Sequence, residues 1–553
     1  ALNAMGAAPG KIILTSGAYL WLNGAASYSV DIDAQSGSHG ICFSQPEGVV
    51  GNAYGKISGG GWIDKRDRGT IILHNTSNNY TNWTSIYDGG AVQADSGAGL
   101  PTASFVNLNG GVLQSNGTTT FTRSLGTTGS GKFQWNTSGG GFAGGAGPMT
   151  VRVNNGTSTL TWGTTVGSQI VGTLKFGSTT AANTVTFENG IDLNAVQRTI
   201  HVEDNPNSGG DIAIVSGVLT DVQAFSSNLW TGALRKTGPG TLILTGGDAG
   251  QRNEYGDGLG HVGSTTIADG ALQADRDKGL SGWSGLILDG GVLQSNSAIT
   301  YAEPLWGFGG ETSRRVIWKS GGFSAGGGKM TVNIGGGATP QTINFGGSDG
   351  KQAIAGILKL SSNSARYETE LRNGLNLNGG ARTVQVDDNP FEAGDFATVS
   401  GVISGSGSLT KTGSGTLYLS GSSGNTYSGA TTLTAGRLRL NKTSGVAIPG
   451  NLNLTGNGVE NNYVYLERSN QIAASAIVTF ANDPAYSSRL NLLGNSQTVA
   501  GISCSDGRGV IQNTENESGI STNGVLTLNT ASDYAYNGYL RDRYQSGSTG
   551  KVA

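Results

Sequence analysis

The sequence predicts an all-β fold, an elongated right-handed parallel β-helix, also called a β-solenoid. Three observations predict it: an excess of glycine, short runs in which apolar and polar residues alternate, and a long internal repeat. The chain has 553 residues, whereas a single globular core stops growing at roughly 250 to 300 residues. It therefore consists of several domains or of one repetitive structure.

The composition indicates an ordered protein built from turns and short strands. Glycine contributes 95 residues, and charged residues make up only 13% of the chain, against about 25% in an average globular domain. Disorder is not expected, because apolar residues reach 36% and the net charge is −3. Glycine does not fall at every third position, which excludes collagen. Because the net charge is near neutral, we expect no nucleic-acid partner. The sequence contains no apolar run of about 20 residues, so no membrane-spanning helix is expected.

Short β-strands are predicted where apolar and polar residues alternate between glycines and asparagines. Examples are the runs 241–245, 375–378, 437–441 and 524–529. Helical periodicity is missing, so parallel strands have no crossover helices and can pair only if successive coils stack. With about 20 to 25 residues in each coil, the chain would form roughly 22 to 28 coils. A β-propeller is the structural rival, but its blades repeat at about 40 to 50 residues.

A much longer repeat is visible directly in the sequence. The motif at 90–95 recurs at 270–275, and the motif at 110–116 recurs at 290–296, each 180 positions later. Such self-similarity is the signature of a repeat architecture. We expect four divisions: an N-terminal partial solenoid module (1–89), two solenoid modules (90–269 and 270–435) and a C-terminal partial module (436–553).

One segment occurs three times, at 63–73, 234–244 and 409–419. Each copy has an apolar residue, a lysine two positions later, and a turn that leads into Gly-Thr-apolar-x-Leu. In the first copy, Asp67-Arg68 stands where Gly-x is expected. The motif residues are Lys65 in the first copy, Lys236, Gly238 and Gly240 in the second, and Lys411, Gly413 and Gly415 in the third.

These segments resemble the passenger-associated transport repeat, or autotransporter-associated β-strand repeat, of bacterial autotransporter passengers. That family has the pattern Leu-x-Lys-x-Gly-x-Gly-Thr-Leu-x-Leu-x-Gly followed by Asn-x-Tyr-x-Gly, and here Tyr80 and Tyr427 follow the first and third copies. The resemblance implies a β-helical passenger exported by a Gram-negative-type bacterium. It also implies that the Lys-x-Gly-x-Gly turns serve folding and not ligand binding.

Residues that could carry catalytic or metal-binding chemistry are sparse. The four histidines, His39, His74, His201 and His261, have no metal-ligand spacing. No Gly-x-Ser-x-Gly elbow, Walker loop or His-Glu-x-x-His motif occurs. We therefore expect a non-enzymatic protein with no catalytic residue, no metal and no cofactor.

Acidic clusters provide a first test of the alternative, a carbohydrate-binding or carbohydrate-active β-helix, because such enzymes use paired carboxylates. They lie at 203–204, 275–277 and 387–388. The first and last occupy equivalent repeat positions before Asn-Pro, which favours turn chemistry over catalysis. The alternative would instead place one non-repeated cluster of carboxylates, arginine and tryptophan on a single face.

Tryptophans provide a second test of that alternative, because their rings can bind sugars. Trp135 and Trp318 are repeat equivalents, which favours packing in the core. The remaining candidates for exposed patches are Trp62, Trp83, Trp230, Trp283 and Trp306.

The two cysteines and the two ends of the chain predict self-association. Both ends consist of strand-like runs without caps, as expected of a segment of a longer passenger or of subunits that meet head to tail in a filament. Cys42 and Cys504 lie near opposite ends, too far apart in a rod to bridge within one chain. We hypothesise a disulfide between subunits; the alternative is two buried free thiols.

Together these observations predict a secreted or cell-surface structural protein, acting as a stalk, an adhesin or an extracellular matrix fibre. The predicted partners are other copies of the chain, in a head-to-tail homopolymer, or components of the cell surface or matrix.

Overall fold

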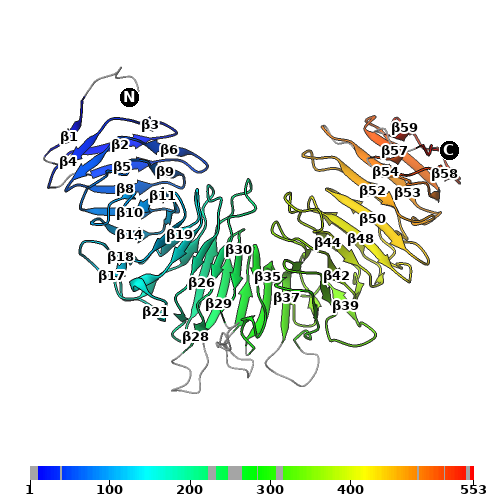
Figure 1. The fold of residues 1–553 in the computed structure, drawn as a ribbon. Helices are drawn as coiled ribbons and strands as arrows, with labels where there is room; N and C mark the ends of the chain where they lie inside the picture. The colour runs from blue at the N-terminus through cyan, green and yellow to red at the C-terminus, as the bar shows by residue number, and fades with distance from the viewer. Residues whose placement is uncertain are drawn as a thin grey trace. The chain divides into compact units, whose positions relative to one another are not determined.

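The computed structural model describes residues 10–15, 17–37, 40–221, 232–246, 264–282, 284–306, 315–481, 485–515, 517–543 and 549–553. Short strands stack side by side along the chain (Figure 1), and the stacked strands pair in parallel. The one helical element in these residues is a 3₁₀ turn, η2 (Val153–Asn155). The predicted all-β parallel β-helix is confirmed.

The chain divides into two compact units, 1–285 and 286–553. This division follows the packing, whereas the four predicted modules follow the repeat period, so the module boundaries stay predictions. Each unit is built from columns of stacked parallel strands.

The first unit has two long columns and several shorter ones. The first column contains β2 (Tyr19–Asn23), β5 (Gly40–Ser44), β8 (Trp62–Arg66), β10 (Trp83–Tyr87), β14 (Phe105–Asn109) and β18 (Lys132–Trp135). The second contains β3 (Ser27–Tyr28), β6 (Val50–Ala53), β9 (Thr70–Leu73), β11 (Ala91–Gln93), β15 (Val112–Gln114), β19 (Gly140–Ala143), β23 (Leu174–Phe176), β26 (Gln197–Val202), β29 (Ala233–Thr237) and β31 (Ser264–Ile267). The others contain β1 (Ile12–Leu14), β4 (Ile32–Ala34) and β7 (Ile57–Gly59), then β16 (Thr119–Phe121), β20 (Met149–Val151), β24 (Val185–Phe187), β27 (Ala213–Val215), β30 (Thr241–Leu244) and β32 (Ala271–Gln273), with β21 (Leu160–Gly163) beside them.

The second unit repeats this arrangement. One column contains β35 (Gly285–Ser295), β37 (Val316–Ala325), β41 (Leu358–Leu360), β44 (Ala381–Gln385), β47 (Ser408–Thr412), β49 (Thr431–Leu433), β51 (Leu452–Leu454), β53 (Ile477–Phe480) and β56 (Gly501–Cys504). The next contains β36 (Ile299–Tyr301), β38 (Met330–Val332), β42 (Thr369–Leu371), β45 (Ala397–Val399), β48 (Thr416–Gly421), β50 (Arg437–Lys442), β52 (Asn462–Leu466), β54 (Ser488–Asn491), β57 (Gly509–Thr514) and β59 (Tyr539–Arg543). The shortest contain β39 (Thr342–Phe345) with β43 (Gly374–Asn376), and β55 (Ser496–Val499) with β58 (Val525–Leu528).

The coils differ in length more than the sequence predicts. Leu409 on β47 pairs with Thr431 on β49, 22 residues later, whereas Gly321 on β37 pairs with Leu358 on β41, 37 residues later. The predicted 20 to 25 residues are therefore right for the coil at Leu409 but too few for the coil at Gly321. Extra residues enter at the corners, where an insertion does not disturb the strand register.

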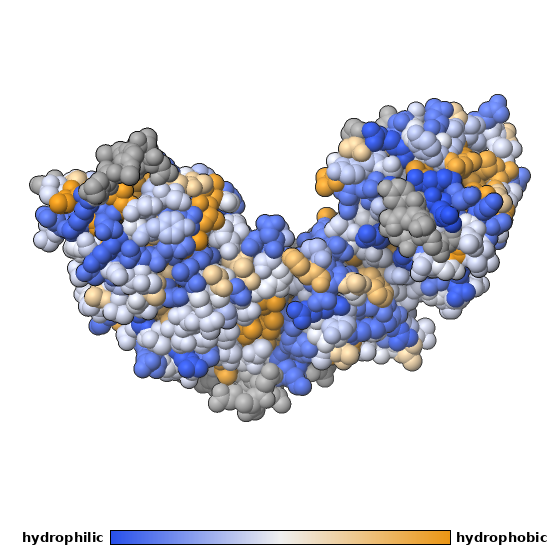
Figure 2. Space-filling view, turned by 45° about the horizontal axis from the view of Figure 1, so that its top comes forward, coloured by the Kyte–Doolittle hydropathy of each residue, from blue (hydrophilic) through white to orange (hydrophobic). Residues whose placement is uncertain are grey.

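Apolar side chains stack in columns inside each coil. In the second unit, Leu417, Leu438, Val464, Leu490 and Ile511 lie next to one another on successive strands, and all are fully buried. Each coil buries little surface alone, so its stability depends on its neighbours. Residues in hydrophilic and intermediate colours cover much of the surface in view, and the orange patches lie among them (Figure 2).

Hydrogen-bonded polar side chains also line up on successive strands inside the coils. Such a polar ladder occurs in each of the two units. Gln114 on β15 accepts a hydrogen bond from the Ser178 hydroxyl at 2.5 Å. Its repeat equivalent Gln294 on β35 accepts bonds from Ser324 at 3.0 Å and Ser362 at 2.7 Å. Buried polar groups are tolerated when they are hydrogen-bonded in this way.

Trp135 and Trp318 are core residues, as predicted, because both are fully buried. The indole N–H of Trp135 donates to the Gly140 carbonyl at 3.1 Å, and that of Trp318 donates to the Gly321 carbonyl at 2.8 Å. Each ring packs against a phenylalanine, Phe142 in the first unit and Phe323 in the second.

Candidate functional site

The three motif lysines occupy one structural position, at the end of a strand and inside the coil. Lys65 lies on β8, Lys236 on β29 and Lys411 on β47, and each is fully buried. We call each lysine, with the four residues that follow it, a lysine turn. Lysine is almost never fully buried without partners, so its contacts must explain the motif.

Each ammonium group binds backbone carbonyls at the turn. Lys236 donates to the carbonyls of Thr237 at 3.1 Å, Gly238 at 2.7 Å and Asp269 at 3.0 Å. Asp269 belongs to the next coil, directly before the first residue of the motif 270–275. The three donors of an ammonium group are thus all used, and the lysine fastens one coil to the next.

Lys411 makes a similar set of contacts in the third copy, two within its own turn and one to the next coil. It donates to the carbonyls of Gly413 and Gly415, the latter at 2.6 Å, and to Ala435 of the next coil at 3.1 Å. The recurrence of a cross-coil bond in two copies shows why the motif requires lysine at this position.

The glycines of the motif allow the turn to approach the preceding coil. Gly238 and Gly413 have φ angles of 79° and 77°, a left-handed conformation that glycine adopts without steric cost. A Cβ atom on either residue would lie 2.3 Å from the carbonyl oxygen of Val202 or Val386. A Cβ on Gly240 or Gly415 would be equally close to backbone, at 2.3 and 2.6 Å.

The first copy keeps this geometry although its sequence departs from the motif. Asp67 occupies the position of Gly238 and Gly413 and has a φ of 59°. Lys65 donates to the Asp67 carbonyl at 2.8 Å, and the Asp67 carboxylate accepts a hydrogen bond from the Ser44 hydroxyl. Aspartate tolerates the left-handed region better than most residues, so the turn survives the substitution.

Burial shifts the protonation of these lysines. It lowers the pKa of Lys236 and Lys411 to about 7 and that of Lys65 to about 8. Desolvation disfavours the charged amine, and distant acidic side chains only partly offset it. A lysine turn therefore depends on pH near neutrality.

The second half of the repeat motif is also structural. Asn425 accepts a hydrogen bond from the Ile403 amide at 2.9 Å and donates to the Ala447 carbonyl at 2.8 Å, so its side chain bridges the backbone of two coils. Tyr427 is buried, and its hydroxyl pairs with Thr431. In the first copy, Asn78 and Tyr80 make equivalent contacts, to Ile57, Gly99 and Thr84.

A parallel β-helix with recurrent lysine turns is a repeat protein whose motif residues hold neighbouring coils together. The family model of the passenger-associated-transport-repeat matches residues 234–274 and 409–440, which are the second and third copies. The chain thus carries the repeat of autotransporter passengers, and the resemblance found in the sequence is confirmed. No curated protein and no solved structure matches the chain.

The acidic pairs before Asn-Pro form corners, as predicted. At the second corner the Asn389 amide donates to the Asp395 carboxylate at 2.5 Å, and the Asn389 side chain donates to the Ala365 carbonyl at 2.7 Å. Asn205 and Asp211 make the same contact in the first unit, at 2.6 Å. We call 204–211 and 388–395 the Asn-Pro corners; burial raises the pKa of Asp211 to about 7 and of Asp395 to about 6.

The third acidic cluster is also part of a turn. The Asp275 amide donates to the Lys278 carbonyl at 3.2 Å, and Asp277 has a φ of 62° and donates through its amide to the Leu280 carbonyl at 2.9 Å.

The histidines of the described residues make ordinary local contacts. His74 stacks on Tyr54 at 4.3 Å and pairs with Asn52 at 2.8 Å. His201 lies 3.3 Å from Glu203 in a pocket of about 250 Å³. Within the described ranges, no group of three or more His, Cys, Asp or Glu side chains could hold a metal ion. His39 and His261 lie outside the described residues.

Both cysteines are buried free thiols. Cys42 is fully buried on β5, and burial raises its pKa to about 11. Cys504, on β56, is within 3.3 Å of the Asp506 carboxylate and accepts a bond from the Gly509 amide at 3.3 Å. The hypothesis of a disulfide between subunits stays a prediction.

Sequence reasoning missed a face on the second unit where arginines alternate with tyrosines across successive strands. The Arg437 guanidinium lies over the Tyr463 ring at 5.7 Å. Arg439 lies between Tyr418 and Tyr465, 5.7 and 4.3 Å from the two ring centres. We call this set the arginine-tyrosine face. The alternation in 437–441 signals outward arginines, but their tyrosine partners depend on strand register.

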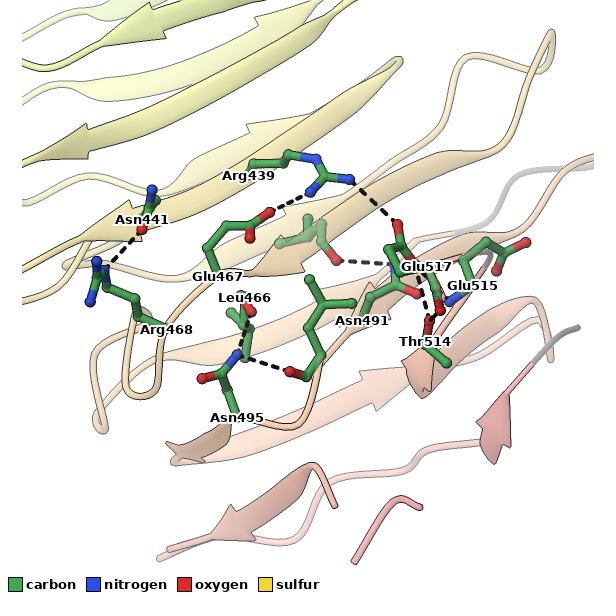
Figure 3. Close-up of polar contacts among 12 residues, drawn as sticks. Arg439, Asn441, Leu466, Glu467, Arg468, Asn491, Asn495, Thr514, Glu515 and Glu517 are labelled. Atoms are coloured by element: carbon green, nitrogen blue, oxygen red, sulfur yellow. Dashed lines mark hydrogen bonds and ion pairs between the residues drawn. The ribbon is translucent and has the colours of Figure 1, made fainter. Parts of the chain in front are cut away.

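Arg439 is held in place by two carboxylates. Figure 3 shows its guanidinium between Glu467, with which it forms a hydrogen-bonded ion pair, and Glu517 at 3.4 Å. Burial disfavours its charge, but Tyr418 and Glu467 keep the pKa of Arg439 above its ordinary value. Its orientation is thereby fixed toward the outer surface of β48 and β52.

The remaining predicted tryptophans do not gather at this face. Trp83 is partly exposed in the first unit and packs against Phe105, while Trp62 contacts Tyr19. The Arg315 guanidinium lies over Trp306 at 5.2 Å. Trp230 and Trp283 lie outside the described residues. In the part of the chain that the structure describes, no helix is long and apolar enough to cross a membrane.

Proposed function

We propose that the chain is a non-enzymatic structural protein of the secreted or cell-surface type, a β-helical stalk or adhesin of a Gram-negative-type bacterium. The lysine turn carries this proposal. It recurs in three copies, its lysines bind backbone carbonyls of the protein itself, and its two most regular copies match a repeat named for passenger transport.

The turns would help the chain to fold coil by coil. Each of Lys236 and Lys411 bonds to a carbonyl of the following coil, so a folded coil presents a buried amine to the next one. In a repeat protein the interface between neighbours supplies most of the stability. Folding that begins at one end can then propagate along the chain.

The location is tested by protease treatment of intact cells that produce the protein. We expect an added protease to degrade the protein in its wild-type form while cytoplasmic markers stay intact. A Lys236→Met, Lys411→Met double variant should show less surface material, because its coils pack less firmly. Complete protection of the wild-type protein on intact cells would refute a surface location.

Head-to-tail assembly into filaments is the finer part of this proposal. It is tested by electron microscopy of the purified protein and by non-reducing electrophoresis. Filaments joined through Cys42 and Cys504 require both buried thiols to become accessible at a subunit contact. Covalent dimers that disappear on reduction, and in a Cys42→Ser variant, would support the disulfide; a monomer band alone would refute it.

A further inference from the structure

The second unit contains a pocket of about 400 Å³ at its outer surface. One side is the second Asn-Pro corner, 388–395, and the other is formed by outward side chains of β48 and β50. Its volume falls within the range of about 300 to 1,000 Å³ typical of small-ligand sites. The lining residues used below are Asp388, Glu392, Phe396, Tyr418, Arg437 and Arg439.

Two aromatic rings form part of the pocket wall. The Phe396 and Tyr418 ring centres are 5.1 Å apart with an angle of 57° between the planes. Both residues are partly exposed, and the Arg439 guanidinium lies 5.7 Å from the centre of the Tyr418 ring. A partly exposed aromatic ring in a pocket wall offers a flat apolar surface to a ligand.

Both hydrogen-bond acceptors and hydrogen-bond donors line the pocket beside these aromatic rings. Asp388 and Glu392 supply carboxylate oxygens from the corner, one oxygen of Glu392 being 3.4 Å from Nε of Arg366, and Arg437 supplies guanidinium donors from β50. Arg437 is exposed and forms no ion pair within the residues that the structure describes, and its guanidinium lies over the Tyr463 ring. Its donors are thus available to a ligand, unlike those of Arg439, which Glu467 and Glu517 occupy.

The aromatic and arginine side chains of the pocket are not needed by the scaffold. The first unit builds the same corner with Asn205 and Asp211, yet Ile212 stands there in the place of Phe396. On the neighbouring strands, Ile243 pairs with Gln273 where Tyr418 pairs with Arg439 in the second unit. Arg437 likewise corresponds to Ala271, which pairs with Thr241 as Arg437 pairs with Thr416. One copy of the repeat therefore carries a cluster that the fold does not require.

We propose that this pocket binds a neutral saccharide. A carboxylate that accepts and a guanidinium that donates two parallel bonds suit the adjacent hydroxyls of a sugar ring, and the apolar face of the ring suits Tyr418. Carboxylates outnumber guanidinium groups in the pocket lining, so an acidic sugar would be repelled. This inference goes beyond the structural function and does not depend on it.

Isothermal titration calorimetry of the full chain with maltotriose, cellotriose, lactose and N,N′-diacetylchitobiose tests the proposal, with digalacturonate as the acidic comparison. We expect saturable binding of at least one neutral saccharide. Tyr418→Ala should weaken that binding about five- to tenfold, because a stacked ring contributes on the order of 1 to 1.5 kcal/mol. Tyr418→Phe should stay within about threefold of the wild type.

Two further variants separate binding from folding. Asp388→Asn should weaken binding, since a charged acceptor is lost without any change in size. Arg468→Ala should bind as the wild type does, because Arg468 contacts Asn441 and is not part of the pocket lining. The proposal is overturned if none of the four neutral saccharides binds, or if only digalacturonate binds. It is also overturned if Tyr418→Ala binds as tightly as the wild type while all variants have the same thermal unfolding midpoint.

Discussion

The second and third repeat copies, 234–274 and 409–440, share their inner residues and differ in their outer ones. Both bury a lysine on a turn whose first glycine has a positive φ. The outward positions, in contrast, carry Ile243 and Gln273 in one copy and Tyr418 and Arg439 in the other. The difference teaches that the coil fixes the residues that join neighbours and leaves the outward residues free to vary.

The shared lysine should have the largest effect on stability in both copies. Lys236→Met or Lys411→Met keeps most of the side-chain volume but leaves carbonyls without a protein donor. We expect each variant to lower the local free energy of unfolding by about 2 to 3 kcal/mol. Hydrogen exchange of the amides in β29 and β47 measures this loss.

Lys319→Met is the matched control, because the Lys319 side chain is 48% exposed. It should leave exchange on the neighbouring strands unchanged. Wild-type exchange rates in both turn variants would show that the lysines do not hold the coils together, and the comparison between the copies would then lose its shared element.

The turn glycines should have the next largest effect. Alanine at Gly238 or Gly413 would combine a positive φ with a Cβ 2.3 Å from a carbonyl oxygen, and we expect a loss of about 1 to 3 kcal/mol. Gly156→Ala is the control, because a Cβ there meets only one atom, at 4.0 Å. Urea unfolding of the three variants measures the effect. Equal midpoints for the turn and control variants would contradict the steric argument.

The pH dependence of the free energy of unfolding tests the buried lysines of the two copies in a second way. Between about pH 7 and 10, Lys236 and Lys411 are mostly neutral in the folded chain, while unfolded lysine keeps its proton up to its ordinary pKa of 10.5. The unfolded state then binds more protons, so the free energy of unfolding should rise with pH. Urea unfolding at pH 7, 8 and 9 measures the slope. A Lys411→Met variant should show a smaller rise, and an identical slope would contradict the lowered pKa.

The contribution of the Asn-Pro corners to the free energy of unfolding should change with pH in the opposite direction to that of the lysine turns, and by a smaller amount. Burial raises the pKa of Asp211 and Asp395 above the ordinary 3.8, so between about pH 4 and 6 the folded state binds more protons. The contribution of these groups to stability therefore falls as pH rises. Asp395→Asn keeps an oxygen acceptor but cannot titrate. Relative to the wild type it should gain on the order of 1 to 3 kcal/mol between pH 4 and 7 in urea unfolding, and a constant difference would contradict this.

The sequence predicts the inner residues well because they recur. The offsets of Lys236 and Lys411 are enough to identify a shared turn. The ladder from Gln114 to Ser178 and the stacking of Arg439 on Tyr465 could not be predicted, because their partners lie 64 and 26 residues away. Such a pairing depends on the exact number of residues in each intervening coil, and coils range from 22 to 37 residues between the paired strands compared above. These numbers are not evident from the sequence, so the neighbours of an outward side chain could not be assigned from it.

At Asp67 the sequence departs from the motif while the conformation of the turn is kept. Replacing Asp67 by glycine should therefore have the smallest effect on stability. It holds the position of Gly413 at a φ of 59° and accepts a bond from Ser44. Asp67→Gly removes the cost of the left-handed conformation but also the Ser44 bond, so the free energy of unfolding should change by less than about 0.5 kcal/mol. Asp67→Val cannot relax in this way, because a β-branched residue is strained at positive φ, and it should lose at least about 1 kcal/mol in urea unfolding. If glycine proved as harmful as valine, the Ser44 bond and not the backbone conformation would decide which residue the first copy accepts.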